Sequence, residues 1–110
     1  MMKNDPILSL ISLCAKGRNV VSGAFATEKA VKEGKASLVI VTEDASDNTR
    51  KKFKDMCEYR DIPFYLYSDM DSMGRSVGCE MRTSIAVVDE GLAVKLIEKL
   101  DVVKANGGNK

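Results

Sequence analysis

The chain of 110 residues contains no histidine and no tryptophan, and aromatic residues make up only 5% of it. It also contains no plausible nucleophile–base pair and no glycine-rich dinucleotide-binding motif. Hydrolytic and redox chemistry therefore lack their usual residues, and we expect a protein that is not an enzyme. The shortage of aromatic residues means that the hydrophobic core must be built mainly from aliphatic side chains.

Cysteine is also scarce, because the three residues Cys14, Cys57 and Cys79 are widely spaced and form no CxxC pair. A zinc site needs a closer group of cysteine and histidine ligands, so no metal and no other cofactor is expected. We interpret Cys14 and Cys57 as small hydrophobic core residues in a reducing compartment. For Cys79, which follows Gly78, an exposed reactive thiol and an inert thiol both stay open.

Excess charge of either sign is missing as well, since 17 basic and 16 acidic residues give a net charge of +1. Non-specific wrapping of nucleic acid normally needs a strongly basic domain, so DNA is not an expected partner. The composition is 45% hydrophobic and 30% charged, which is typical of a globular domain. Any anion-binding surface must therefore arise from uneven placement of the charges.

Long hydrophobic runs are absent too, and no segment is long enough to span a membrane. The N-terminal stretch resembles a signal peptide only weakly, because Asp5 stands where positive charge is expected and Ser9 and Ser12 interrupt the apolar run. The pair Asp5-Pro6 instead predicts the start of a helix. We therefore expect a cytoplasmic protein without a membrane partner.

Helical patterns alternate with short apolar runs along the chain. Helices are expected at about 6–16 and 24–33, from Ser46 or Asp47 to Ile62-Pro63, after Asp69, and around 92–100; strands are expected at 20–21, 38–41, 64–67 and 84–88. This order predicts an α/β protein, a three-layer α/β/α sandwich around a small mixed four-stranded sheet. A single domain is expected over residues 1–103, followed by a flexible C-terminal tail at 104–110.

The segment 17–44 contains the most informative feature, a helix that is predicted to begin just after Gly23. The free backbone N–H groups of Ala24 to Ala26 would then face outward beside Lys29 and Lys32. The start of a helix attracts anions, most often phosphate. A solvent-exposed helix surface without a ligand is the alternative.

Three other features have two interpretations each. Met81 either folds back onto the core or contacts a splayed nucleotide base, with Arg82 on the RNA backbone nearby. Carboxylates follow two predicted strands, at 43–44 and at 89–90. In one interpretation they are the acid–base or metal-binding groups of an enzyme, and in the other they cap the following helices. The basic run at 50–54 is either functional or, with acidic neighbours diluting its field, a solvent-exposed surface.

Several motifs together resemble a known family. Residues 29–45 (KAVKEGKASLVIVTEDA), 62–64 (IPF), 73–78 (MGRSVG) and 85–89 (IAVVD) are similar to the kink-turn RNA-binding ribosomal protein family, the large-subunit "L-seven-A-e" family. The resemblance extends over about 17–100. Residues 20–23 (VVSG) and 44–52 (DASDNTRKK) are more similar to the bacterial YlxQ-type branch of that family.

The resemblance implies an α/β/α sandwich that binds RNA without catalysis. The family's recognition motif is glycine, any residue, Asn, Glu, two further residues and Lys, and here Gly23 and Lys29 match it. Phe25 and Ala26 stand where Asn and Glu belong, and neither side chain can make polar contacts to base edges. Nearby, Glu28 adds a negative charge. Met81 and Arg82 differ from the small apolar residues that the family tends to have in the later loop.

The leading hypothesis is therefore a non-catalytic, ribosome-associated protein that binds structured RNA, either ribosomal RNA or a kink-turn, with a ribosomal or translation-factor protein as a further possible partner. The alternative is a protein-interaction module in which Phe25 and Ala26 have turned the RNA surface into an apolar one. An exposed Phe25 beside Met81, in a patch without lysines, would favour that alternative. The candidate RNA-binding residues are Gly23, Ala24, Phe25, Ala26, Lys29, Lys32, Glu43, Arg75, Met81, Arg82 and Thr83.

Overall fold

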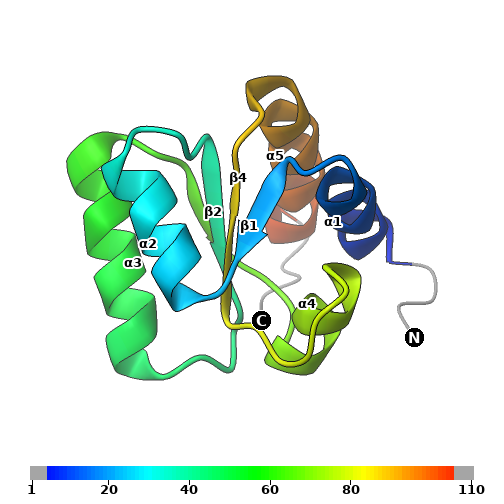
Figure 1. The fold of residues 1–110 in the computed structure, drawn as a ribbon, viewed down its shortest axis with the longest axis horizontal. Coiled ribbons are helices and arrows are strands. Elements are labelled where there is room, and N and C mark those ends of the chain that lie inside the picture. Colours follow the sequence, from blue (N-terminus) through cyan, green and yellow to red (C-terminus); the bar gives the residue numbers. More distant parts are fainter. Residues whose placement is uncertain (1–4, 106–110) are drawn as a thin grey trace.

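Helices and strands alternate throughout residues 5–105, the part of the chain that the computed structural model describes (Figure 1). The expected order of elements is confirmed. The elements are α1 (Pro6–Lys16), β1 (Val20–Ser22), α2 (Ala24–Lys32), β2 (Leu38–Val41), α3 (Asp47–Arg60), β3 (Phe64–Leu66), α4 (Met70–Ser76), β4 (Ser84–Val87) and α5 (Glu90–Ala105).

The four strands form one mixed sheet in the order β1-β4-β2-β3. β2 and β3 are parallel, whereas β4 is antiparallel to both of its neighbours, with Val41 opposite Ser84 and Ser22 opposite Ile85. β1, β2 and β3 therefore finish at the end of the sheet where β4 begins. Four connections meet at this end, namely β1–α2, β2–α3, β3–α4 and α4–β4.

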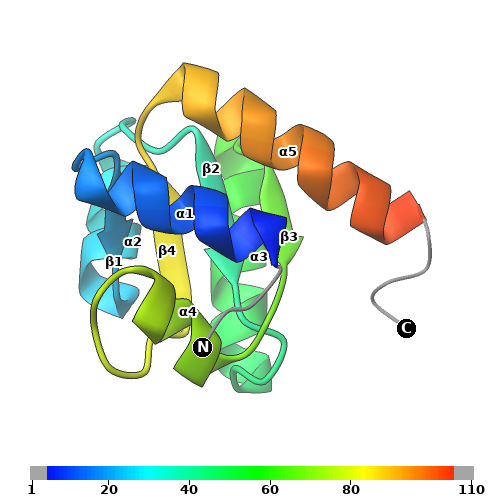
Figure 2. The same ribbon diagram turned by 90° about the vertical axis from the view of Figure 1, so that its right-hand side faces the viewer.

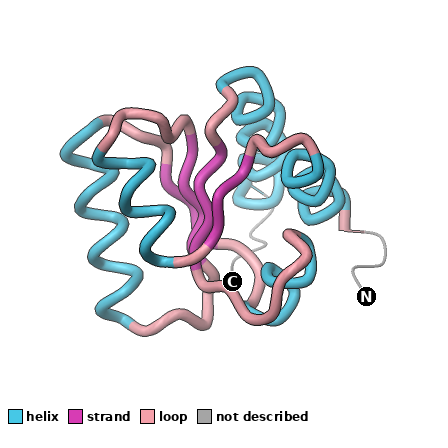
Figure 3. Tube along the Cα trace, in the orientation of Figure 1, coloured by secondary structure: helices cyan, strands magenta, loops and turns pink. Residues whose placement is uncertain are grey.

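Two hydrophobic cores lie on opposite faces of the sheet, as the period of two along a strand requires. Val39 and Val41 pack with α2 and α3, whereas Leu38 and Ile40 pack with α1, α4 and α5. Figure 3 shows the strands between these two helical layers. The predicted three-layer α/β/α sandwich is confirmed, and its cores are largely aliphatic.

The helices begin in two different ways. At four of the five, a side chain accepts a hydrogen bond from a backbone N–H group of the first turn, which satisfies one of the free donors. α2 begins instead after Gly23, which has no capping side chain. The four caps are Asp5 to Leu8 at 2.9 Å, Ser46 to Thr49 at 3.1 Å, Asp69 to Ser72 at 2.7 Å and Asp89 to Leu92 at 2.9 Å.

The C-terminal helix is longer than expected, since Lys104 and Ala105 belong to α5. The rest of the predicted tail, 106–110, lies outside the described residues. Cys14 and Cys57 are buried free thiols, as predicted, and burial raises the pKa of both, that of Cys57 to about 11. Within residues 5–105, none of the helices combines the length and apolar character needed to cross a membrane.

Candidate functional site

The turn between β1 and α2 depends on glycine. Gly23 has φ 96° and ψ 156°, a backbone conformation that is essentially restricted to glycine. Its N–H group donates to the carbonyl of Ser84 at 2.9 Å, and its own carbonyl accepts from the N–H group of Thr27 at 2.9 Å. The N–H groups of Ala24, Phe25 and Ala26 have no acceptor within residues 5–105. The positive end of the helix dipole is therefore open.

Arg82 lies directly against this turn. Its Nε donates to the hydroxyl of Ser22 at 3.2 Å, and its Nη1 donates to the carbonyl of Met81 at 3.0 Å. A Cβ atom at Gly23 would lie only 3.8 Å from the Nε of Arg82. A fixed cation thus accompanies the open N–H groups, although the two residues belong to distant parts of the sequence.

The loop that carries Arg82 is held in place on three sides. The N–H group of Arg82 donates to the carbonyl of Met70 at 3.0 Å, and the carbonyl of Thr83 accepts from Thr42 at 2.9 Å. On α4, a Cβ atom at Gly74 would lie 1.6 Å from the carbonyl oxygen of Glu80. The absence of a side chain at Gly74 therefore allows the loop to pack against α4.

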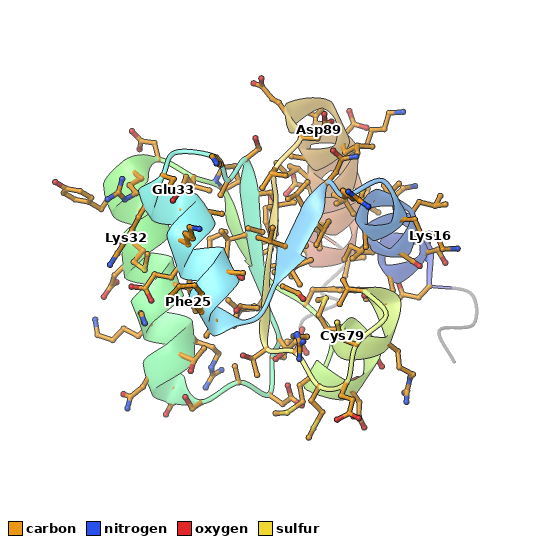
Figure 4. The ribbon with its side chains drawn as sticks, viewed as in Figure 1. Lys16, Phe25, Lys32, Glu33, Cys79 and Asp89 are labelled. Carbon is orange, nitrogen blue, oxygen red and sulfur yellow. The ribbon has the colours of Figure 1, made fainter. Side chains whose placement is uncertain are left out.

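Phe25 and Met81 are large apolar side chains that are exposed at this end of the sheet. Phe25 lies on the first turn of α2 (Figure 4) and is 82% exposed. Met81 is 58% exposed. Lys29 lies one turn further along α2, is also exposed, and makes no ion pair within residues 5–105. The surface is therefore apolar and cationic together, and it is not the lysine-free patch that would favour a protein-interaction module.

Lys32 differs from Lys29, because its ammonium pairs with Glu28 at 2.9 Å. The other carboxylate oxygen of Glu28 pairs with Lys52 of α3 at 2.8 Å. Hydrogen bonds from Lys52 and Lys32 lower the pKa of Glu28 to about 2. The single negative charge of Glu28 thus lies between two ammonium groups, one on α2 and one on α3, whereas Lys29, in the last turn of α2, makes no ion pair within residues 5–105.

The remaining predicted residues do not converge on Gly23. Glu43 follows β2, is exposed, and lines a hollow next to β3. Arg75 lies on α4 and, with Met81 and Cys79, lines a separate hollow of about 350 Å³. The structure therefore brings Gly23–Ala26, Lys29 and Met81–Thr83 to one region, which we call the Gly23 surface.

The carboxylates of the enzyme hypothesis lie at opposite ends of the sheet, because β2 and β4 are antiparallel. Glu43 and Asp44 follow β2 at the Gly23 end, and Asp44 accepts a hydrogen bond from the N–H group of Met70 at 3.1 Å. Asp89 lies at the other end, where it caps α5 (Figure 4). Within residues 5–105, no cluster of cysteine and carboxylate side chains is suited to hold a metal ion.

The basic run on α3 is an exposed surface whose charges are paired. Arg50, Lys51 and Lys54 each pair with an acidic residue three or four positions away, namely Asp47, Asp55 and Glu58. Lys52 pairs with Glu28. These pairs reduce the positive field of the run, in agreement with the interpretation as a solvent-exposed surface.

Several hydroxyl groups beneath the Gly23 surface were not singled out from the sequence. Ser22 accepts the hydrogen bond from Arg82. Thr27, Thr42 and Ser84 are buried, and their hydroxyls have no hydrogen-bond partner within residues 5–105. An isolated serine or threonine at the end of an apolar strand gives no local signal of such a position, since it depends on how the strands are ordered.

The comparisons with known proteins agree with this geometry. Residues 5–97 match the model of the family described as "Ribosomal protein L7Ae/L30e/S12e/Gadd45 family". The chain belongs to this family. The resemblance predicted from the sequence is therefore confirmed.

Individual members of the L7Ae/L30e/S12e/Gadd45 family are similar over most of their length. The RNA-binding protein YlxQ of Bacillus subtilis is 44% identical over 92 residues, which cover 84% of this chain and 92% of that protein. The RNA-binding protein YlxQ of Enterococcus faecium is 33% identical over 95 residues, covering 86% and 90%. The similarity to the YlxQ-type branch is thus confirmed as well.

Solved structures of two proteins share the fold. A protein of unknown function from Bacillus halodurans superimposes with a TM-score of 0.84 at 35% identity, covering 87% of this chain and 97% of that one. The Giardia lamblia 15.5kD RNA binding protein superimposes with a TM-score of 0.75 at 22% identity, covering 91% and 92%. At that lower identity the likeness shows the fold alone.

Proposed function

We propose that this chain is a non-catalytic protein that binds structured RNA through the Gly23 surface. The main support for this proposal is the uncapped start of α2. Three backbone N–H groups there lack an acceptor within residues 5–105, and Arg82 packs beside them. The names of the YlxQ relatives support RNA as the ligand. Because the family is described by ribosomal proteins, ribosomal RNA is the class of target that we propose.

Phosphate is the part of RNA that fits the open helix start. Backbone N–H groups and the helix dipole stabilise a negative charge there, and the guanidinium of Arg82 and the ammonium of Lys29 add positive charge. Phosphate contacts position a protein on RNA but do not read its sequence. Binding through these groups should weaken steeply as the salt concentration rises.

Phe25 fits an unpaired base, because its exposed ring can stack on any base face. Neither Phe25 nor Ala26 carries a polar side-chain atom that could pair with a base edge. The proposed recognition therefore depends on stacking and on phosphate geometry, and it should favour RNA in which the backbone bends sharply and a base is splayed out. A kink-turn is the RNA element to test first.

The test is to measure the affinity for a kink-turn RNA and for a straight duplex of matched length over a salt series. We expect tighter binding to the kink-turn RNA. Phe25→Ala should weaken that binding on the order of tenfold, since stacking contributes about 1–3 kcal/mol per base. Tyr59→Ala is a matched control, because Tyr59 is an equally exposed aromatic residue on α3, 85% exposed.

Two results separate the parts of the proposal. Equal binding to both RNAs that Phe25→Ala leaves unchanged would rule out stacking on an unpaired base. Absence of binding to either RNA at low salt, with a folded protein, would overturn the RNA-binding proposal and favour a protein partner for Phe25 and Met81. The flanking charges of Lys29 and Arg82 make that second function the weaker one.

A further inference from the structure

A second surface of interest is the open edge of the sheet at β3 (Figure 2). The N–H group of Val39 donates to Pro63 at 3.0 Å, and that of Tyr67 donates to Val41 at 3.0 Å. Because alternate residues of a parallel pair face each other, Phe64 and Leu66 direct their N–H and C=O groups away from β2. These groups are available to an additional strand.

A hollow of about 410 Å³ runs along this edge between α3 and α5. On the α5 side, the hollow is lined by Leu100 and Val103 and by Lys104, whose ammonium lies 5.4 Å from the centre of the Tyr65 ring. On the α3 side, Leu66 is 39% exposed and lies with Arg50 and Lys54. Both sides of the hollow therefore combine apolar and cationic side chains.

Positive charge predominates in the hollow, since three cationic side chains line it with one carboxylate, Glu43. The Nε of Arg50 is shielded from solvent and has no hydrogen-bond acceptor within residues 5–105. Arg50 and Lys54 pair only with the exposed carboxylates of Asp47 and Glu58, the latter at 4.0 Å. Exposed pairs of this kind stabilise a protein little, so both cations can turn to a new carboxylate.

We propose that the β3 edge binds an extended acidic segment of another protein as a fifth strand of the sheet. Side chains of an added strand alternate between the two faces. Carboxylates would meet Arg50 and Lys54, and the intervening apolar side chains would meet Leu100 and Val103. The bound segment is thus a stretch in which acidic and apolar residues alternate.

A second copy of this chain fits the edge less well. Antiparallel pairing of two β3 strands would bring Arg50, Lys54 and Lys104 of one chain close to the same cations of the other. Like charges across paired strands are destabilising. An acidic peptide compensates the same charges, which is why we commit to it as the occupant.

The test uses a short peptide of alternating glutamate and valine and follows the backbone amide NMR signals of the full chain. We expect the largest shifts at Phe64 and Leu66. Leu66→Pro should abolish binding, because it removes an N–H group that faces away from β2 and leaves the bonds to β2 intact. The preceding residue is already in an extended strand, as proline requires.

A second pair of variants tests the charges and does not depend on tolerance of proline. Arg50→Gln with Lys54→Gln should weaken peptide binding on the order of tenfold. Lys51→Gln with Lys52→Gln is the matched control, because these two lysines are on the same helix but do not line the hollow. An alternating lysine–valine peptide should not bind.

Several outcomes would overturn the proposal. If no peptide shifts the β3 amides, the cations only protect the edge from aggregation. If the chain alone is a dimer and Leu66→Pro makes it a monomer, a second copy occupies the edge. If Arg50→Gln with Lys54→Gln weakens RNA binding but not peptide binding, the hollow belongs to an RNA site.

Discussion

The start of α2 contrasts with the starts of the four other helices. Those four are closed by a side chain of Asp5, Ser46, Asp69 or Asp89. α2 has glycine at the corresponding position and leaves its N–H groups open. A capping side chain stabilises a helix start by only about a few tenths of a kcal/mol more than glycine does, so the chain loses little stability by leaving this one start open. Such local exceptions are expected at functional sites.

The open start is not left unsupported, however. Four helix starts are stabilised by residues within three positions along the chain, whereas α2 is held by a loop that is distant in sequence. Arg82 reaches Ser22 across 60 positions, and Gly74 holds the loop against α4. The comparison of α2 with the four capped helices shows that tertiary contacts can position the start of a helix while its backbone N–H groups stay available to a ligand.

Disrupting the packing of the Arg82 loop against α4 should have the largest effect on stability. In Gly74→Ala, the new Cβ would lie 1.6 Å from the carbonyl oxygen of Glu80, and backbone would have to move. We expect a loss of about 3 kcal/mol in the free energy of unfolding, measured by urea denaturation. Gly91→Ala is the control, since its Cβ would meet only the Asp89 carboxylate at 3.5 Å. Similar losses in both variants would contradict this packing role.

Changing Gly23 at the open start of α2 should have the next largest effect on stability. Gly23→Ala places a side chain at φ 96° and should lower the free energy of unfolding by about 2 kcal/mol. It should also weaken RNA binding, because the N–H groups of Ala24 to Ala26 would move. The affinity and the urea midpoint are both measured.

Ser46→Ala is the comparison at a capped helix. We expect it to lower the free energy of unfolding by about 1 kcal/mol and to leave RNA affinity unchanged. An equal loss of affinity in Gly23→Ala and Ser46→Ala would mean that RNA binding responds to overall stability and not to the open helix start.

The sequence predicted the features that depend on neighbouring residues. Pro6 and Gly17 mark the ends of α1, and Asp69 and Ser46, the latter as one of two candidates with Asp47, were predicted at helix starts, because these signals lie within one helical turn. The mixed four-stranded sheet was also predicted, from the alternation of apolar strands and helices. Its strand order was not, since no local pattern records that β4 lies between β1 and β2.

The site was predicted less completely than the fold, for the same reason. Lys29 and Lys32 look equivalent in the sequence, but only Lys32 is paired. Its partner Glu28 also binds Lys52 and so joins α2 to α3. Arg82 was identified as a candidate, but its contact with the Gly23 turn depends on the order of the strands. Lys104 was assigned to a tail by composition and instead belongs to α5.

The two lysines of α2 allow a comparison within one helix, because only Lys32 is paired with an acidic residue. Lys29→Ala should weaken RNA binding a few-fold and reduce the slope of affinity against salt by roughly one phosphate contact. Lys32→Ala should do so less, because the carboxylate of Glu28 already offsets its charge. Binding isotherms over a salt series measure both slopes. Equal slopes in the two variants would show that the ion pair does not shield Lys32 from RNA.

The smallest effect on stability should come from Glu28, which joins α2 to α3 through its ion pair with Lys52. Its folded-state pKa of about 2 lies below the usual value of 4.5 for a glutamate, so the stabilisation is present above about pH 4.5 and is lost as the pH falls towards 2. Stability should therefore fall more steeply in this range for the wild type than for Glu28→Gln. Added salt should reduce the difference, because all three partners are partly exposed. Parallel pH profiles would mean that Glu28 does not hold Lys32 and Lys52, and α2 would then present two free lysine charges to RNA, those of Lys29 and Lys32, instead of one.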